Sequence, residues 1–218
     1  MSERVQISSA ARRVQTFIAV FVGVALLLRL GLTLFHPDAD SDPHVLVRLE
    51  RFVSFFTIQS NFVVLLAALA VACDRVFETP WSRALRLAAL VGITVTGIVY
   101  IAILAGDSHQ TGLSQVANLM LHYIAPPLTV LAWLAFGPWQ ALSFADIPRA
   151  LAWPAAWIAY TLGHGAITDW YPYGFIDVVA KGYGRVFVSI GFITLFAAVL
   201  SCAFIGLSNL RRRPTPAP

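Results

Sequence analysis

The sequence predicts an all-α fold, an integral membrane bundle of six transmembrane helices. The first observation is composition: 58% of the 218 residues are hydrophobic and 12% are charged. A soluble domain carries about twice that charged fraction. The second observation is that apolar runs recur six times, each long enough to cross roughly 30 Å of hydrocarbon as a helix. Little chain remains for a soluble part, so we expect residues 1–218 to form a single domain.

Each predicted span is an apolar run bounded by polar or basic residues. The spans cover residues 14–35, 48–73, 86–106, 113–136, 150–168 and 184–208. The first occupies the position of a signal peptide, but its run is too long, Arg29 interrupts it and no small-x-small cleavage pattern follows. We therefore expect a retained helix. The last residues, 209–218, are basic and proline-rich and are predicted to form a disordered tail.

Basic residues predict the orientation, because Lys and Arg in short loops are retained on the cytoplasmic side. One face of the predicted bundle carries ten of them, namely Arg4, Arg12, Arg13, Arg75, Arg83, Arg86, Arg149, Arg211, Arg212 and Arg213. The other face carries four, namely Arg48, Arg51, Lys181 and Arg185. Both termini are therefore expected to be cytoplasmic, in a multi-pass protein of the cell (plasma) membrane. No basic patch with interleaved aromatics indicates a nucleic acid partner.

Polar side chains gather in the outer half of the predicted bundle. Thr57, in FFTIQSN, and His122, in NLMLHYIAPPL, lie at matching depths of about 13 Å below the outer ends of their spans, at 1.5 Å per residue. The same half also holds Arg29, Asn61, Tyr100, Asn118 and His164. Because unpaired polar groups are costly in hydrocarbon, such residues face one another or a wet cavity, and an ionisable one is a functional candidate. The alternative is that they only hydrogen-bond neighbouring helices, which we expect of Gln59, Ser60, Thr94, Thr96 and Thr161.

A pair of prolines marks the span that contains His122. Pro126 has no N–H, so the carbonyl four residues earlier, that of His122, loses its helical partner. We expect the helix to bend near residues 122–127 beside a cavity lined by Thr57, Asn61, Asn118 and His122. A neutral imidazole there can accept the proton of a nearby hydroxyl, which is the minimum requirement for nucleophilic acyl chemistry.

Three stretches, FFTIQSN, NLMLHYIAPPL and HGAITDWYPYGF, resemble in this order the androgen-induced membrane protein family, whose bacterial members are described as Pr-six-Pr family membrane proteins. The resemblance covers most of the chain from the second span onward. It implies a bacterial membrane protein and a threonine hydrolase that cleaves a fatty acid ester of a hydroxy fatty acid. Matched onto this sequence, the nucleophile is Thr57 and the base is His122. No cofactor is expected.

The family's late motif is matched by Thr168, Trp170, Tyr171, Pro172 and Phe175, and we expect Trp170 to contact the substrate. Gly174 separates Tyr173 from Phe175 where the animal sequences have Tyr-Pro-Phe, so a different substrate mouth is expected.

Two further polar residues carry alternative interpretations. Arg29 is either the binder of a fatty-acid carboxylate, through its fork of donors, or an arginine that extends to the headgroups. His164 is either a substrate contact or a hydrogen-bonding residue at the rim, where Asp107 or Asp169 could orient it or His122.

Two other classes of function remain open. The same polar residues would line a pathway in a small transporter or permease, or would link helices in a non-catalytic scaffold. Transporters usually show repeats and matching broken helices, and no period recurs here. The expected partners are membrane lipids and a lipid ester. Asp38, Asp40 and Asp42 imitate a calcium loop, but Pro43 and Leu49 replace its Gly and Glu, so no metal is expected.

Overall fold

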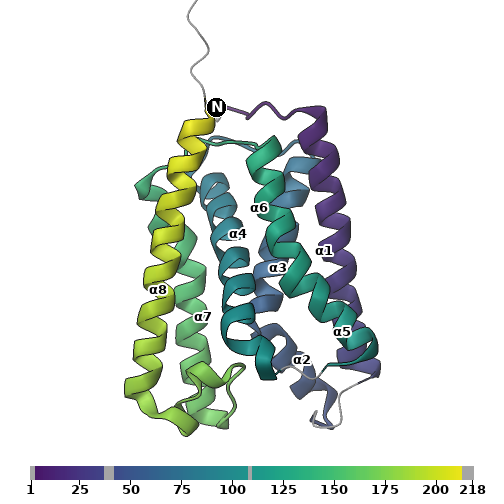
Figure 1. Cartoon of the computed structure of the whole chain (residues 1–218), viewed down its shortest axis with the longest axis vertical. Helices are drawn as coiled ribbons and strands as arrows, with labels where there is room; N and C mark the ends of the chain where they lie inside the picture. Colours follow the sequence, from purple (N-terminus) through teal and green to yellow (C-terminus); the bar gives the residue numbers. More distant parts are fainter. Residues whose placement is uncertain (1–2, 37–41, 108–109, 213–218) are drawn as a thin grey trace, which may run out of the picture.

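The computed structural model describes residues 3–36, 42–107 and 110–212, and these ranges form a bundle of helices (Figure 1). Extended pairing within them is limited to an isolated bridge between Arg4 and Phe77. Asp38 and Asp40 of the rejected calcium loop lie outside the described residues. So do Arg213 and the rest of the predicted tail from residue 213 onward. The tail's first residues are helical, because the last helix continues to Arg211.

The helices follow one another along the chain in simple order. They are α1 (Ser9–Phe35), α2 (Val45–Ser54), α3 (Phe56–Ala72), α4 (Pro80–Val99), α5 (Gly112–Asn118), α6 (Ala125–Phe136), α7 (Ile147–Thr168) and α8 (Val178–Arg211). A π-helical turn, η1 (Tyr100–Leu104), extends α4, and another, η3 (Leu119–Ile124), joins α5 to α6.

Side-chain caps begin three of the long helices. The Ser8 hydroxyl accepts from the Ala11 N–H at the start of α1, and the Thr79 hydroxyl accepts from the Ser82 N–H at the start of α4. The Asp177 carboxylate does the same for Ala180 in α8. Each cap satisfies an amide that has no partner inside the helix, so these starts are encoded locally.

Helix length and hydropathy identify the fold as that of a multi-pass membrane protein. Within the described residues, four continuous helical segments are long and apolar enough to span a membrane: Ser9–Phe35, Pro80–Leu104, Gly112–Phe136 and Val178–Arg211. The bent pair α2 and α3 provides a fifth if it counts as one span. Helix α7 has 22 residues but falls short in hydropathy, because it contains His164, Pro154 and several Trp, Tyr and Gly residues.

The prediction of one continuous helix over residues 48–73 is wrong, because the segment is divided at Phe55. Phe55 has an extended backbone (φ −69°, ψ 124°), and α2 and α3 are bent by 67° across it. Helix α2 carries Arg48, Glu50 and Arg51 on a short segment, so it cannot lie in hydrocarbon like its neighbour. The break places Thr57 at the start of a helix instead of within one.

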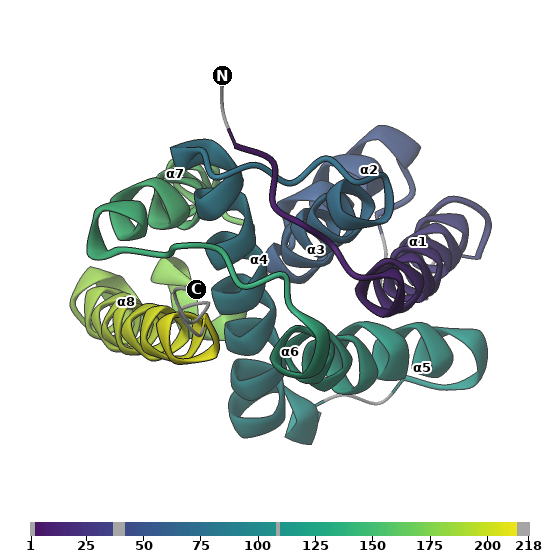
Figure 2. The ribbon, with the colours of Figure 1, turned by 90° about the horizontal axis from the view of Figure 1, so that it is seen from above.

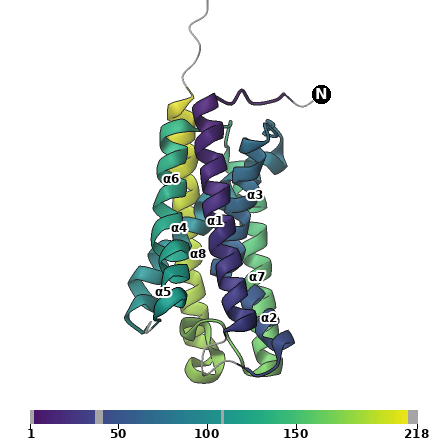
Figure 3. The same ribbon diagram turned by 90° about the vertical axis from the view of Figure 1, so that its right-hand side faces the viewer.

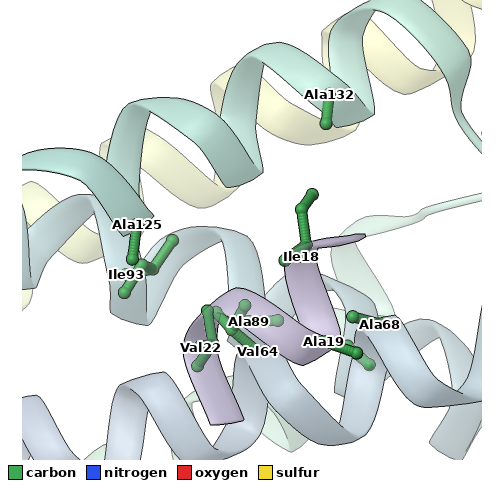
Figure 4. Close-up of a cluster of buried hydrophobic side chains, with 10 residues drawn as sticks. Ile18, Ala19, Val22, Val64, Ala68, Ala89, Ile93, Ala125 and Ala132 are labelled. Atoms are coloured by element: carbon green, nitrogen blue, oxygen red, sulfur yellow. The ribbon is translucent and has the colours of Figure 1, made fainter. Parts of the chain in front are cut away.

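Helix α4 lies at the centre of the bundle (Figure 2), with α7 and α8 on one side and α1, α3 and α6 on the other. One buried cluster joins α4 to α1, α3 and α6, and small side chains such as Ala19, Ala68, Ala89, Ala125 and Ala132 dominate it (Figure 4). A second cluster joins the opposite face of α4 to α7 and α8. Small residues allow close van der Waals packing, which drives helix association in lipid.

The two ends of the bundle differ. Helix α1 begins and α8 ends at one end (Figures 1 and 3). The other end, here called the α2 end, holds α2, the start of α5 and the α7–α8 loop (Asp169–Asp177). The predicted site residues fall in the half of the bundle nearest the α2 end.

Candidate active site

Thr57 and His122, predicted to lie at matching depths, are in contact. The Thr57 Oγ1 atom lies 3.0 Å from the His122 Nε2 atom. Thr57 is buried, at 7% exposure, and both side chains line one cavity near the α2 end. The distance is within hydrogen-bond range for a hydroxyl and an imidazole.

The second ring nitrogen of His122 decides which tautomer fits this geometry. Its Nδ1 atom lies 3.2 Å from the Asn118 carbonyl oxygen, one turn earlier. Because a carbonyl only accepts, Nδ1 carries the hydrogen in the neutral ring, and Nε2 is left as the acceptor. The Thr57 hydroxyl therefore donates to Nε2, which is the direction that general-base catalysis requires.

The break at Phe55 gives Thr57 a second property. Thr57 is the second residue of α3, so its N–H belongs to the first turn and has no partner within the helix. This N–H donates to the Tyr173 hydroxyl over 3.1 Å. The positive end of the helix dipole also lies here, and it favours negative charge that develops beside Thr57.

Tyr173 is the residue that sequence reasoning missed. Its hydroxyl lies 3.2 Å from the Thr57 Oγ1 atom, and its ring packs edge-on against Phe55 with centroids 5.7 Å apart. Burial raises the pKa of Tyr173 above its ordinary value, so the phenol keeps its proton at neutral pH and can donate it in a hydrogen bond. Tyr173 belongs to the DWYPYGF motif, in which the predicted substrate contact was Trp170.

Where the sequence predicts a bend near Pro126, the structure has a π-helical turn, Leu119–Ile124, within one continuous helical segment. In the π-helical turn the Ala125 N–H bonds to the Met120 carbonyl, five residues earlier. In this register Pro126 deprives the carbonyl of Leu121, and not that of His122, of its partner. The Asn61 side-chain nitrogen donates to that Leu121 carbonyl over 3.3 Å.

Asn61 therefore braces the site and does not face it. It is fully buried, also donates to the Thr57 carbonyl over 2.9 Å, and does not line either of the two cavities at Thr57. The expectation that it lines the cavity, as a substrate-binding residue, does not fit this placement. Its two bonds connect the Thr57 turn of α3 to the His122 turn of η3.

Tyr100 and Asn118 complete the wall behind the imidazole. The Tyr100 ring stacks on His122 with centroids 3.9 Å apart, and its hydroxyl accepts from the Asn118 side-chain amide over 2.6 Å. Both line the cavity with His122, and their role in substrate binding stays a prediction. The stack restricts the imidazole to the orientation that reaches Thr57.

The cavity at the α2 end, here called the vestibule, has a volume of about 530 Å³, and among the described residues its wall holds three arginines and one carboxylate, that of Asp42, which lies 3.8 Å from the Arg51 guanidinium. Its lining includes Arg29, Arg48, Arg51 and Trp170. The Arg48 guanidinium donates to the Thr33 and Leu34 carbonyls in the last turn of α1 and to the Asp42 and Pro43 carbonyls before α2. The Arg51 guanidinium lies 5.2 Å over the Trp170 ring, a cation–π contact that fixes the α7–α8 loop against α2.

His164 lies away from the pair, which favours the predicted hydrogen bond at the rim over the alternative of a substrate contact. Its Nε2 atom is 2.7 Å from a Glu50 carboxylate oxygen, and it does not line the vestibule. The acid that meets it is thus Glu50, where the sequence had suggested Asp107 or Asp169. His164 joins α7 to α2 at the rim.

A second, smaller cavity of about 150 Å³ meets the vestibule at Thr57. It is here called the slot, and it runs between α4, α7 and α8. Thr57, Tyr100, Leu104 and Tyr173 line both cavities. Thr57 is therefore reachable from two sides of different chemical character.

Within the described ranges, no group of three or more His, Cys, Asp or Glu side chains is placed to hold a metal ion. The fold and the site together define a multi-pass helical membrane protein with a buried hydroxyl–imidazole pair between two cavities. No protein-family model, curated protein sequence or solved structure matches this chain. The resemblance to the androgen-induced family stays a prediction, and its motif residues are those quoted above.

Proposed function

We propose that this chain is a membrane hydrolase that cleaves a lipid ester, with Thr57 as nucleophile and His122 as general base. The observation that carries the proposal is the 3.0 Å contact between the Thr57 hydroxyl and His122 Nε2, with Nδ1 directed at a carbonyl. The same two residues match the nucleophile and base that the resemblance implies. Transport remains the rival class, because the helix broken at Phe55 is also typical of transporters.

The proposed reaction has two halves. In the first, Thr57 Oγ1 attacks the ester carbonyl carbon while its proton passes to His122 Nε2, and the tetrahedral intermediate collapses as that proton passes to the departing alcohol. In the second, His122 takes a proton from water, the resulting hydroxide attacks the acyl-threonine, and the proton returns to Thr57. Fatty acid and alcohol are released, and the enzyme is regenerated.

Charge on the carbonyl oxygen of the intermediate requires hydrogen-bond donors. The buried Tyr173 hydroxyl lies beside Thr57 Oγ1 and carries a proton at neutral pH. On substrate binding it would turn that proton from Thr57 towards the carbonyl oxygen. The N-terminal end of α3 adds a favourable field at the same point.

The vestibule supports an anionic lipid ester as the substrate class. Arg29 lines it together with Arg51, which is already paired with the Asp42 carboxylate at 3.8 Å. Guanidinium groups bind carboxylates in a planar, bidentate manner. A fatty acid ester of a hydroxy fatty acid carries a free carboxylate of this kind. Trp170 supplies an apolar surface beside these cations.

The proposed setting is the plasma membrane of a bacterial cell, with α7 as the sixth span and both termini cytoplasmic. Helix α7 packs against α4 and α8 in the bundle (Figure 2), and its 22 residues are close to the 20 of α4. Ten basic residues against four favour the orientation. The vestibule then faces the outer side.

Release of fatty acid by the purified protein in phospholipid nanodiscs tests the proposal, with a fatty acid ester of a hydroxy fatty acid as substrate. Thr57→Ala and His122→Ala should each lower kcat by about a hundredfold or more, and the double variant should be hardly worse, because the pair acts as a unit. Thr57→Ser should retain part of the activity, since it keeps the hydroxyl.

Thr94→Ala is the matched control. Its hydroxyl bonds to the Leu90 carbonyl of its own helix and lines neither the vestibule nor the slot. The proposal fails if the parent protein releases no fatty acid, or if both alanine variants turn over at the parent rate with unchanged thermal stability.

A further inference from the structure

The slot extends from Thr57 towards the middle of the bundle. Along α4 its wall runs from Tyr100 to Val91, a rise of about 13 Å at 1.5 Å per residue. Leu151 of α7 and Ala197 of α8 lie at its far end. The cavity is therefore narrow and elongated, and parallel to the helices.

The slot is apolar along its length. Aliphatic side chains of α4, α7 and α8 form most of the wall, and no charged side chain lines it. The hydroxyl of Thr96, one of its few polar groups, is engaged with Ser60 Oγ at 2.7 Å. This lining fits a hydrocarbon chain, whereas the vestibule with its arginines does not.

Small residues open one side of the slot towards the membrane. Ala155 of α7 and Thr194 of α8 both line it and are both exposed. The neighbouring surface of α8 is strongly apolar, with Phe192 at 70% and Leu195 at 62% exposure. A lipid chain can thus enter sideways between α7 and α8 without passing through water.

The position of His122 decides which part of an ester belongs in the slot. His122 lines the vestibule and is absent from the lining of the slot. As the group that returns a proton to the departing alcohol, it requires that alcohol on its own side of Thr57. The acyl chain, attached to the other side of the carbonyl carbon, must then lie on the slot side.

We propose that the slot between α4, α7 and α8 binds the acyl chain of the ester, which enters laterally from the bilayer between Ala155 and Thr194. This inference rests on the proposed hydrolysis at Thr57. A chain of about ten carbons fills the slot, since an extended carbon chain advances about 1.25 Å per bond. Moving a lipid tail from the bilayer into the slot gains little hydrophobic free energy, because both surroundings are apolar. The contribution of the slot to the reaction is therefore to orient the ester. It holds the carbonyl carbon against Thr57 Oγ1.

Thr194→Trp tests the slot, because the indole would occupy its exposed side. The matched control is Leu195→Trp, one residue along α8, where the side chain already faces outward. The substrates are p-nitrophenyl butanoate and p-nitrophenyl decanoate, which share a leaving group. Thr194→Trp should lower kcat/KM for the decanoate by about tenfold or more and leave the butanoate within about twofold, whereas Leu195→Trp should change neither. Equal effects on both esters, or none, would overturn the proposal.

A second measurement tests whether an acyl chain occupies the slot and does not depend on turnover. Decanoic acid bearing a terminal diazirine is photo-crosslinked to the Thr57→Ala variant in nanodiscs, and the labelled peptides are mapped by mass spectrometry. Label should concentrate on residues 151–158 and 193–197, and the added Thr194→Trp change should remove it. Label spread evenly over the lipid-facing helices overturns the slot even if esters are hydrolysed. Label in the slot of a chain that hydrolyses no ester leaves the slot standing and removes the hydrolase proposal.

Discussion

Gly97 of α4 faces Pro126 of α6 so closely that a Cβ atom on the glycine would stand 2.8 Å from the Cβ atom of the proline. The same Cβ would lie 3.5 Å from the His122 carbonyl oxygen. Gly97 therefore sets how near the central helix approaches the π-helical turn that carries the proposed base. Glycine permits this approach because it has no side chain.

Gly97→Ala is expected to destabilise the protein by about 1–3 kcal/mol, because the ring of Pro126 cannot move out of the way. Activity should fall as well, since η3 must shift and carries His122 with it. Thermal unfolding in detergent and ester hydrolysis measure the two effects. Gly191→Ala is the control, because a Cβ at that helical position meets nothing within 4 Å. A Gly97→Ala protein as stable as the control would contradict this packing.

Asn61→Ala should cost about 1 kcal/mol of stability, a typical value for a hydrogen bond between membrane helices. It removes the donor that the Leu121 carbonyl receives in place of a Pro126 N–H. Because the same amide ties α3 to η3, kcat should drop while KM changes little. Ser201→Ala serves as control, since that fully buried hydroxyl bonds within its own helix. If kcat is unchanged, Asn61 does not position the pair.

Tyr173→Phe should lower kcat by about ten- to a hundredfold and leave KM nearly unchanged, because the lost hydroxyl acts on the intermediate. The aromatic ring and its contact with Phe55 are kept. Because burial raises the pKa of Tyr173, its proton is lost only above the ordinary value of about 10. Parent and variant should therefore share the shape of the pH–rate profile below that point. Tyr183→Phe, at an exposed position, is the control, and equal kcat values in the two variants would exclude Tyr173 from the reaction.

The orientation can be measured with a membrane-impermeant maleimide on intact cells. Cys73 is exposed and follows α3 at the end where α1 begins and α8 ends. Gly174 is exposed in the α7–α8 loop at the α2 end. In a Cys202→Ser background, Cys73 should react only after the cells are permeabilised. Gly174→Cys, with Cys73 also changed to Ser, should react at once. The reverse pattern would place the vestibule on the cytoplasmic side.

The sequence alone was sufficient for the class of fold and for the central pair. Hydropathy identifies membrane helices because a segment that spans the bilayer must be apolar over its length and must satisfy its backbone hydrogen bonds internally. A constant rise per residue then makes depth a linear function of position, which is why Thr57 and His122 could be paired before their contact was known. Proline chemistry likewise indicated an irregular turn beside His122.

Tertiary structure decided which side of each helix the polar groups face and what they meet. The break at Phe55 and the π register at Leu119–Ile124 are single-residue adjustments that hydropathy, averaged over a whole span, does not resolve. They direct the Asn61 amide to the Leu121 carbonyl instead of to substrate, and they leave the Thr57 N–H without a partner in its own helix, so that it donates to the Tyr173 hydroxyl. The conformation of the α7–α8 loop brings Tyr173 to Thr57. His164 pairs with Glu50 of α2, a segment that was predicted to be continuous with α3. Contacts between residues far apart in sequence depend on how each helix is rotated about its axis and packed against its neighbours. A single amino-acid sequence does not specify that rotation directly.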